Sequence, residues 1–429
     1  MELKGAELGP AEAFELIDGR AGRVASLLAG LVAVDTTVPP GRNYRQMCEV
    51  LAAQFSRLAL EAEFMVEPPD YWAGIPLPLE GERVNLVASK IAGKPPLSVY
   101  AHYDTVPVGE GWTVDPFGGE VKDGLLYGRG TADMKGSIAS LLLALEVMAE
   151  SGLEPLYDIH CLMCCDEEIG LAPGVRYLAE QGYVRGDLLW LEGGGQFPMT
   201  LKAMAGMAEV EVTTRGKAGH SGMGFAGVNA VEAMVPILAE LLLLKEREES
   251  FPSVYRALPI PGGASTQMAS KFNLNMISGG LKLNIIPDSC AVVIDRRYLP
   301  DEDYDTVAGN IREAVARGAA RSKALDVEVN IRHIYKPLVI DENSPGNRKA
   351  ARALQLIHGW GPENWLVAGV SASTDMGDVQ DVVPEADIVG MSPLGLASVA
   401  KPHAEDECVA VADLLRLAKQ LLYYFCFED

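Results

Sequence analysis

The chain has 429 residues and a mass of 46.0 kDa, more than one ordinary hydrophobic core organises, so we expect two domains. Apolar residues make up 48% of it and charged residues 22%, which excludes disordered and fibrous classes of protein. The formal net charge of −23 argues against nucleic acid and anionic bilayers as partners, because both repel so acidic a chain.

The cellular compartment is indicated by the cysteines and by the N-terminal residues. The first twenty residues contain several acids and no uninterrupted apolar run, which is not typical of a secretory signal. Three of the seven cysteines crowd into 161–165, which favours buried thiols over a disulfide framework or a structural zinc site. No apolar stretch reaches the roughly 20 residues that span a bilayer. We expect a cytoplasmic protein that has no membrane partner.

Helical and strand patterns alternate along the first part of the chain. The apolar spacing predicts helices at 21–34, 47–59 and 137–149, and strands at 84–90, 97–101, 159–165 and 188–191. Such alternation is typical of an α/β domain, in which helices flank a mostly parallel sheet.

From about residue 205 the pattern changes. It predicts a strand at 208–214, a helix at 228–244, a strand pair at 282–286 and 290–295, a helix at 304–317 and a strand at 327–334. The order βαββαβ is that of a ferredoxin-like α+β layer. The α/β pattern resumes at Arg348 and ends with a helix at 413–425. We therefore predict one domain formed by 1–204 and 336–429, with a second domain inserted at 205–335.

Five potential metal ligands follow one another along the chain, and three of them come just after a predicted strand. They are His102, Asp133, Glu168, Glu192 and His403. Ligands of open α/β sheets bind beyond the carboxyl ends of the strands. Two histidines and three carboxylates suffice for a pair of divalent ions, and Glu167 remains available to transfer a proton.

Each of these residues also has a structural interpretation. His102 and Asp104 would face the same side of an extended segment, so Asp104 could orient a metal-bound imidazole; the alternative is a core histidine with a capping aspartate. Asp133 lies among glycines, where it could bridge two ions or cap a helix. Glu167 and Glu168 repel each other, so burying both calls for cations, whereas a solvated turn calls for none. The residues alone leave these alternatives open.

The motifs taken in order resemble the co-catalytic metallopeptidase family, which includes acetylornithine deacetylase, succinyl-diaminopimelate desuccinylase, aminoacylase and glutamate carboxypeptidase. The resemblance covers nearly the whole chain. It is carried by His102-Tyr103-Asp104, residues 112–117, Gly128-Arg129-Gly130-Thr131 with Asp133, Glu167-Glu168, Leu191-Glu192 and residues 401–407.

The resemblance implies a dinuclear metal site. His102 and Glu192 would bind one ion, Glu168 and His403 the other, and Asp133 would bridge the two. Zinc is the metal expected from the family, and the carboxylate-rich ligands also suit manganese or cobalt.

The resemblance also implies how the site works. Asp104 would orient His102, and Glu167 would act first as a general base and then as a general acid. The peptide bond from Asp133 to Met134 is expected to be cis.

The inserted domain resembles the lid and dimerisation domain of that family, so we predict a homodimer formed through it. His220, in the segment 216–221, would reach the partner's site and polarise the scissile carbonyl. Asn284 would contact the substrate. Arg297 would bind a carboxylate of the substrate through its two-pronged guanidinium, the alternative being a surface salt bridge.

The predicted function is that of a metal-dependent hydrolase, which cleaves an amide C–N bond in an N-acyl amino acid or a small peptide. The stretch 392–398 is less glycine-rich than in the family, which leaves open the hydrolysis of another C–N bond, as in an aryl amine or an amidine. A catalytically silent metal-binding scaffold is a further alternative, against which Glu167 and the full ligand set argue. His160, His333 and His358 match no motif and are expected to be structural or exposed.

Overall fold

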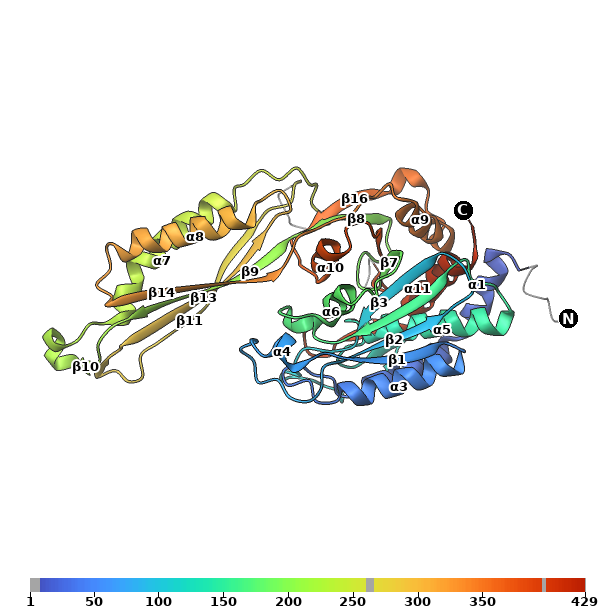
Figure 1. The fold of residues 1–429 in the computed structure, drawn as a ribbon, viewed down its shortest axis with the longest axis horizontal. Helices are drawn as coiled ribbons and strands as arrows, with labels where there is room; N and C mark the ends of the chain where they lie inside the picture. Colours follow the sequence, from blue (N-terminus) through green and yellow to red (C-terminus); the bar gives the residue numbers. More distant parts are fainter. Residues whose placement is uncertain (1–7, 260–265, 396–398, 429) are drawn as a thin grey trace. The chain divides into compact units, whose positions relative to one another are not determined.

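The computed structural model describes residues 8–259, 266–395 and 399–428, with the side chains of 224–226 excepted (Figure 1). The chain divides into two compact units. The first consists of Met1–Leu201, Ile340–Val367 and Asp378–Asp429, and the second of Lys202–Val339 and Ala368–Gly377. No helix among the described residues is both long and apolar enough to cross a membrane.

A six-stranded sheet lies at the centre of the first unit. In spatial order its strands are β1 (Glu61–Val66), β2 (Val84–Lys90), β6 (Asp158–Cys164), β3 (Pro96–His102), β7 (Asp187–Trp190) and β17 (Ile388–Gly390). Strand β2 is antiparallel to both β1 and β6, and the pairings of β6, β3, β7 and β17 are parallel. The predicted α/β domain with a mostly parallel sheet is confirmed.

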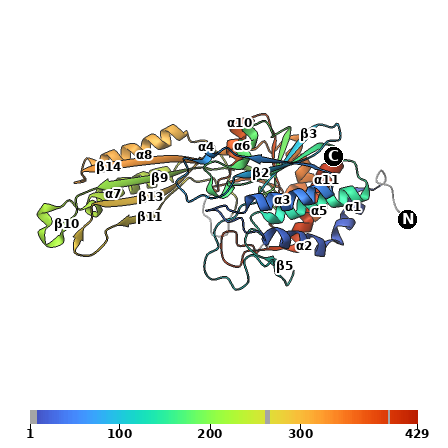
Figure 2. The ribbon, with the colours of Figure 1, turned by 60° about the horizontal axis from the view of Figure 1, so that its bottom comes forward.

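Helices cover this sheet and bury its strands. Successive residues of β2 and β3 are buried, and since neighbouring side chains point to opposite faces, both faces are covered. The helices are α1 (Pro10–Asp18), α2 (Ala21–Val32), α3 (Tyr44–Arg57), α4 (Pro69–Trp72), α5 (Lys135–Ser151), α6 (Gly174–Glu180), α9 (Pro345–His358), α10 (Met376–Val382) and α11 (Val411–Cys426). Helix α5 is buried on nearly all sides and packs against α2 and α11 (Figure 2).

Two small sheets lie outside the six-stranded sheet. One consists of β4 (Val121–Lys122), β5 (Leu125–Tyr127) and β18 (Cys408–Ala410). The other consists of β15 (Leu338–Val339), β8 (Met199–Met204) and β16 (Leu366–Val370), and the chain passes from one unit to the other within β8 and β16. Short 3-10 turns lie at Glu167–Ile169, Ser221–Ala226 and Pro362–Asn364.

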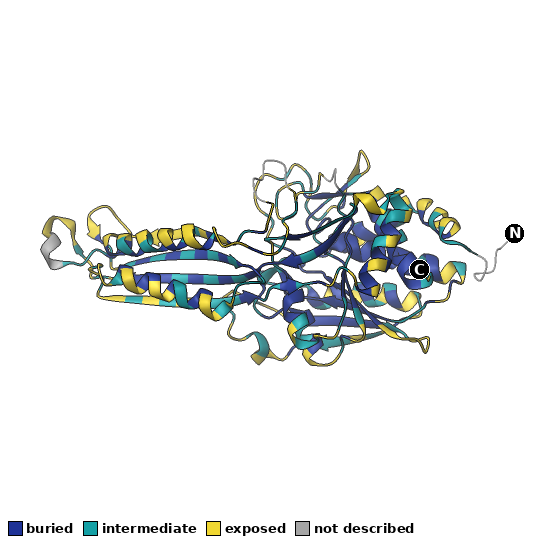
Figure 3. Ribbon diagram, turned by 90° about the horizontal axis from the view of Figure 1, so that it is seen from above, coloured by how far each residue is buried: buried dark blue, intermediate teal, exposed yellow. Residues whose placement is uncertain are grey.

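The second unit contains an antiparallel sheet and two helices. Its strands are β11 (Lys271–Gly279), β13 (Ser289–Tyr298), β9 (Gly206–Arg215) and β14 (Asp326–Tyr335), in that spatial order. Helices α7 (Ala230–Glu248) and α8 (Tyr304–Ala319) pack on it, and a core that includes Val210, Ile237 and Ile311 lies between them. Figure 3 shows alternating buried and more exposed positions along these strands, as expected of a sheet covered on one face.

One predicted strand pairing in this unit is wrong. Strand β13 pairs with β11, whereas the segment 282–286 contributes only β12 (Ile285–Ile286), which pairs with β10 (Gly219–His220). Strand β11 was not predicted. Most of its side chains are exposed, including apolar ones at its end, so the alternation that indicates a half-buried strand is missing.

Candidate active site

Three of the predicted ligands lie at one edge of the central sheet. His102 is the last residue of β3, Glu168 follows β6 in a short turn, and Glu192 follows β7 by two residues. Because β3 pairs in parallel with both β6 and β7, the carboxyl ends of the three strands lie at the same edge. The sheet therefore places these three side chains together.

The other two ligands, Asp133 and His403, come from loops that strand pairing brings together. Asp133 immediately precedes the Met134 cap of α5, and the Asp133–Met134 peptide bond is cis, as predicted. The antiparallel pairing of β18 with β5 brings the segment after His403 alongside the segment that leads to Asp133. Asp133 makes no capping bond to α5, so the helix-cap interpretation does not describe it.

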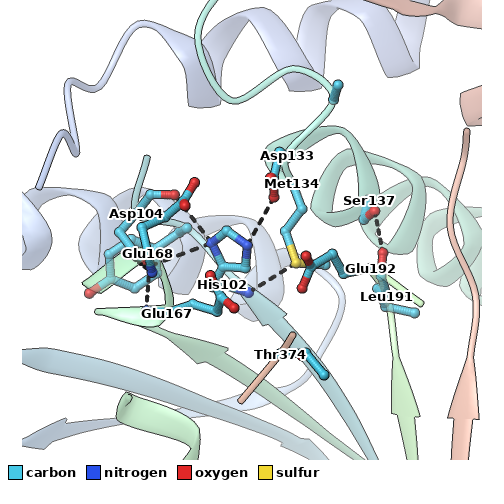
Figure 4. Close-up of polar contacts among 12 residues, drawn as sticks. His102, Asp104, Asp133, Met134, Ser137, Glu167, Glu168, Leu191, Glu192 and Thr374 are labelled. Carbon is cyan, nitrogen blue, oxygen red and sulfur yellow. Dashed lines mark hydrogen bonds and ion pairs between the residues drawn. The ribbon is translucent and has the colours of Figure 1, made fainter. Parts of the chain in front are cut away.

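The five side chains form two groups that share Asp133. Figure 4 shows His102, Asp133, Glu168 and Glu192. His102 Nε2 lies 3.1 Å from Asp133 Oδ1, and His403 Nε2 lies 3.1 Å from Asp133 Oδ2. His403 Nε2 is also 3.2 Å from Glu168 Oε2. In the groups His102–Asp133–Glu192 and Asp133–Glu168–His403, one ligand atom per residue lies within 4.8 Å of the others. This geometry suits two cations that share one carboxylate.

The charges of these groups also fit divalent cations. Hydrogen bonds from the His403 ring to the carboxylates of Asp133 and Glu168 raise the pKa of His403 to about 10. Burial acts to lower the pKa of His102, but Asp104 and Asp133 outweigh it and raise that pKa well above its usual range. Glu168 Oε1 is buried and has no hydrogen-bond partner among the described residues. A buried carboxylate oxygen without a partner is costly, and a cation would satisfy it.

Asp104 connects His102 to the turn that carries the two glutamates. His102 Nδ1 donates to the backbone oxygen of Asp104 at 3.2 Å and lies 3.5 Å from its Oδ1. The Asp104 carboxylate accepts the N–H groups of Glu167 and Glu168, at 3.4 and 3.0 Å. The nitrogen of His102 that faces away from Asp133 is thus oriented, as expected of a metal ligand.

Glu167 and Glu168 are both largely buried, so the solvated-turn interpretation does not describe them. Glu167 is 7% exposed, and the side chain of Glu168 is 5% exposed. In Figure 4 the Glu167 side chain extends from the turn towards His102. The carboxylate beside the third ligand therefore belongs to the same cluster.

Arg129 and Glu407 were not predicted to take part in the site, although both lie in motifs that resemble the family. Glu407 Oε1 accepts the N–H groups of Ala132 and Asp133, at 2.9 and 3.2 Å, and its Oε2 is 2.6 Å from Arg129 Nη1. Arg129 in turn donates to the backbone oxygen of His403 at 3.4 Å. This buried ion pair joins the segments of two ligands that are far apart in the chain.

Trp190 was likewise missed. Its indole N–H donates to Glu192 Oε2 at 3.2 Å, and the side chain is almost fully buried at the end of β7. The only signal in the sequence was that Trp190 lies two residues before Glu192, since residues two apart on an extended segment face the same side.

In the second unit the structure brings His220 and Asn284 together. His220 pairs with Ile285 across β10 and β12, and the Ser221 N–H donates to the Asn284 backbone oxygen at 3.2 Å. Arg297 lies elsewhere on β13. Its guanidinium forms a bidentate pair with Asp295, with distances of 2.8 and 3.2 Å.

The remaining histidines have structural partners. His160 hydrogen-bonds Ser89, His333 hydrogen-bonds Tyr298, and His358 hydrogen-bonds Gln196. The cysteines of 161–165 are buried free thiols, as predicted. Of the loop 392–398, residues 392–395 are described, and Gln196 donates to the Ser392 backbone oxygen at 3.1 Å; residues 396–398 lie outside the described part of the chain.

Comparison with known proteins places this site in a family context. Acetylornithine deacetylase of Pectobacterium atrosepticum is 29% identical over 357 residues, which cover 82% of this chain and 86% of that protein. The fold is that of the di-peptidase Dug1p from Saccharomyces cerevisiae, with a TM-score of 0.78 at 15% identity over 97% of this chain and 98% of that one. The YXEP protein of Bacillus subtilis, a dinuclear metal-binding peptidase, matches with a TM-score of 0.63 at 13% identity over 95% and 98%.

The model of peptidase family M20/M25/M40 matches residues 98–425, a range that includes all five predicted ligands and Glu167. The match spans well over half of the chain. The chain therefore belongs to peptidase family M20/M25/M40 and is a metallohydrolase.

Proposed function

We propose that this protein cleaves the amide C–N bond of an N-acyl amino acid or a small peptide, using a pair of divalent ions. The observation that carries the proposal is the pair of ligand groups that share Asp133, with Glu167 on the adjoining turn. His102 and Glu192 would hold one ion, Glu168 and His403 the other, and Asp133 both. When bound, such a pair of ions lowers the pKa of water and stabilises negative charge on the acyl oxygen.

Glu167 is the proposed general base and then general acid. It accepts one proton from water while the water oxygen attacks the acyl carbon, and it returns that proton to the leaving nitrogen as the C–N bond breaks. The products are a carboxylic acid and an amine. Burial of Glu167 beside Asp104 and Glu168 supports this role, because a proton carrier must be held within reach of the reacting atoms.

His220 is proposed to donate a hydrogen bond to the developing oxyanion. Its Nδ1 accepts the Gly222 N–H at 3.1 Å, so the proton of the neutral ring is on Nε2. The exposed His220 side chain therefore presents an N–H donor. This tautomer supports a role in charge stabilisation.

We propose that the second unit forms a homodimer through α7 and β11, which pack against each other. On α7, Val231, Val235 and Leu242 are 38%, 59% and 49% exposed and are spaced to share one helix face. On β11, an edge strand of its sheet within the described residues, Met276 and Ile277 are 66% and 61% exposed. A free strand edge beside an apolar helix face suits pairing with a second copy.

The proposed substrate is a small molecule that bears a carboxylate. The similarity to acetylornithine deacetylase of Pectobacterium atrosepticum supports an N-acyl amino acid. Arg297 is proposed to bind the carboxylate and Asn284 to contact the substrate. Because Arg297 holds Asp295 in a bidentate pair, a substrate carboxylate would displace Asp295 from the guanidinium. Zinc is the proposed metal, with manganese or cobalt as substitutes that suit the same ligands.

The test of this function is Glu167→Gln in metal-reconstituted protein. We expect kcat for N-acetyl amino acids or dipeptides to fall roughly 10²- to 10⁴-fold, because the variant cannot carry the proton. Metal content by mass spectrometry should match the wild type. Glu61→Gln, on the exposed start of β1, is the matched control and should keep full activity.

Aryl amines belong in the same substrate panel, with a chelator-treated sample beside each assay. Hydrolysis of aryl amines alone would contradict the proposed substrate class. A fully active Glu167→Gln variant would refute the assigned base.

A further inference from the structure

The turn that carries Glu167 and Glu168 begins with a residue in an unusual backbone conformation. Asp166 has φ +62° and ψ +24°, in the left-handed region that most non-glycine residues avoid. The next three residues form the 3-10 turn Glu167–Ile169. The directions of both glutamates therefore depend on what holds Asp166 in place.

The Asp166 carboxylate is fully buried and is held from two sides. Its Oδ2 lies 2.9 Å from Arg83 Nε, and its Oδ1 accepts the Tyr44 hydroxyl hydrogen at 2.6 Å. The N–H groups of the next two residues instead donate to Asp104, on the side of the metal ligands. The turn is thus anchored by its first side chain on one side and by its backbone on the other.

Arg83 is itself rigidly held. Its guanidinium is fully buried and lies over the rings of Tyr44 and Trp72, with 4.9 and 5.4 Å between Cζ and the ring centroids. Its terminal nitrogens donate to the backbone oxygens of Pro40, Gly41 and Glu80, at 2.8 to 3.1 Å. A guanidinium fixed by three carbonyls and two rings is a stationary anchor for a carboxylate.

The local charges explain why such an anchor is needed. Asp166, Glu167 and Glu168 are three successive acids, and carboxylates so close repel one another. Arg83 attracts the first of them, while the Glu168 carboxylate lies 3.2 Å from His403. The ion pair thus separates the charge of Asp166 from those of the two glutamates.

We propose that Asp166 and Arg83 are positioning residues of the metal centre. Their ion pair holds the turn in the geometry that brings Glu168 to the ion shared with His403. The same geometry brings Glu167 to the attacking water. This inference rests on the proposed function for the part played by Glu167. The part of the inference that concerns metal affinity requires only that the five predicted ligands bind divalent ions.

Asp166→Asn tests the ion pair directly. Asparagine also tolerates the left-handed backbone and keeps an oxygen for Tyr44, but it removes the charge that pairs with Arg83. Chelator-treated protein would be titrated with Co²⁺ and followed by its visible spectrum. We expect one of two ions to bind roughly 10- to 100-fold more weakly than in the wild type, while the other stays within about threefold. The kcat should fall by roughly the same factor with little change in KM.

A double-mutant cycle separates the pair from general damage to the fold. Arg83→Met and the double variant would be measured beside Asp166→Asn. If the two residues act as a pair, the double variant should bind the ion about as weakly as the worse single variant, because the second change removes nothing further. Simple addition of the two losses would contradict the pairing.

Glu67→Gln is the matched control, since Glu67 belongs to the same buried cluster. It accepts from Asn85 and Cys165, and its replacement leaves the Asp166–Arg83 pair intact. Its affinity for both ions should equal that of the wild type. A loss as large as that of Asp166→Asn would show that any change in this cluster weakens the site, and would overturn the proposal.

The remaining outcomes are also decisive. Wild-type affinity and kcat in Asp166→Asn would refute the positioning role while leaving the proposed function intact. A wild type that binds two ions but cleaves no amide would refute the proposed function and leave the affinity measurements valid. Circular dichroism checks folding. If Asp166→Asn does not fold, Arg83→Lys is measured instead, because it keeps the charge but loses the two-pronged guanidinium. It should still weaken the binding of one ion, and unchanged affinity there would refute the proposal.

Discussion

At the scale of single residues, Glu67 shows how burial without a cation changes a carboxylate. Glu67 is 2% exposed, and burial raises its pKa from 4.5 to about 8 against the opposing hydrogen bond from Asn85. Its Oε2 has no hydrogen-bond partner among the described residues. Glu67 is therefore held largely neutral at pH 7.

The raised pKa predicts a pH dependence of stability. Between pH 4.5 and about 8 the unfolded chain releases the Glu67 proton and the folded chain retains it, so stability falls as the pH rises. Relative to Glu67→Gln, the wild type should lose up to about 1.4 kcal/mol of unfolding free energy per pH unit in that window. The difference should level off above pH 8.

Urea unfolding of both proteins from pH 5 to pH 9, in chelator, measures this difference. Every other titrating group is common to the two proteins, so its contribution cancels in the difference between their free energies of unfolding. A difference in stability that does not change with pH would show that Glu67 is not held neutral in the folded state.

The sequence could place a proposed ligand at the edge of the sheet where that residue lies at or just after the end of a strand, as for His102 and Glu192. The ion pairs that hold the ligands could not be predicted. Arg83 and Asp166 come from different segments, as do Arg129 and Glu407, and nothing local to an arginine indicates which distant acid it meets.

At the scale of elements, the packing of α5 against α11 depends on a glycine. A Cβ at Gly136, in the first turn of α5, would lie 2.3 Å from the Thr131 backbone oxygen and 3.0 Å from Leu414 of α11. Contacts under 3.0 Å with backbone require the structure to shift. Thr131 lies in the loop that carries Asp133, so the glycine also allows this loop to approach the helix closely.

We predict that Gly136→Ala lowers the free energy of unfolding by about 1 to 3 kcal/mol, the usual cost of overpacking. The matched control is Gly309→Ala in α8, where a Cβ would meet nothing within 4 Å. That variant should gain up to about 1 kcal/mol, because alanine favours a helix more than glycine does. Denaturant unfolding of chelated protein measures both, and equal effects would refute the packing argument.

Elements with strong periodicity were predicted close to their observed limits, as for β2 and α11. Strand β11 was missed because its exposed side chains do not alternate in polarity. The partner of the segment 282–286 was wrong because pairing depends on which strand lies beside it in space.

At the scale of the whole molecule, the proposed dimer predicts complementation between inactive variants. Glu167→Gln lacks the proposed base, and His220→Ala lacks the proposed oxyanion donor. If His220 acts in the partner's site, a mixed dimer holds one site with both residues intact.

Equal amounts of the two variants, mixed and allowed to exchange subunits, should recover up to about a quarter of wild-type activity, because half of the dimers are mixed and each has one complete site. Either variant alone should stay inactive. Sedimentation would verify the dimer, and a mixture that exchanges subunits yet stays inactive would contradict the action of His220 in trans.

The boundaries predicted for the inserted domain stay a prediction, and the second compact unit extends somewhat beyond them. The predicted insertion is 205–335, and the second compact unit is Lys202–Val339 together with Ala368–Gly377. The separate stretch of ten residues joins this unit through contacts such as the Leu258 N–H with the Gly369 backbone oxygen, which local periodicity does not indicate.

The sequence by itself determined the class of fold, and it predicted a set of metal ligands, because each of those residues lies in a local motif whose order along the chain is distinctive. Only the tertiary structure decided how these ligands are held: the spatial strand order β1-β2-β6-β3-β7-β17 differs from the chain order, so residues distant in the sequence become neighbours. The pair Asp166–Arg83 lies where β6 is placed beside β2, and the pair Glu407–Arg129 lies where β18 pairs with β5 in a separate sheet. Their free energy depends on burial and distance, which no spacing of residues along a chain encodes.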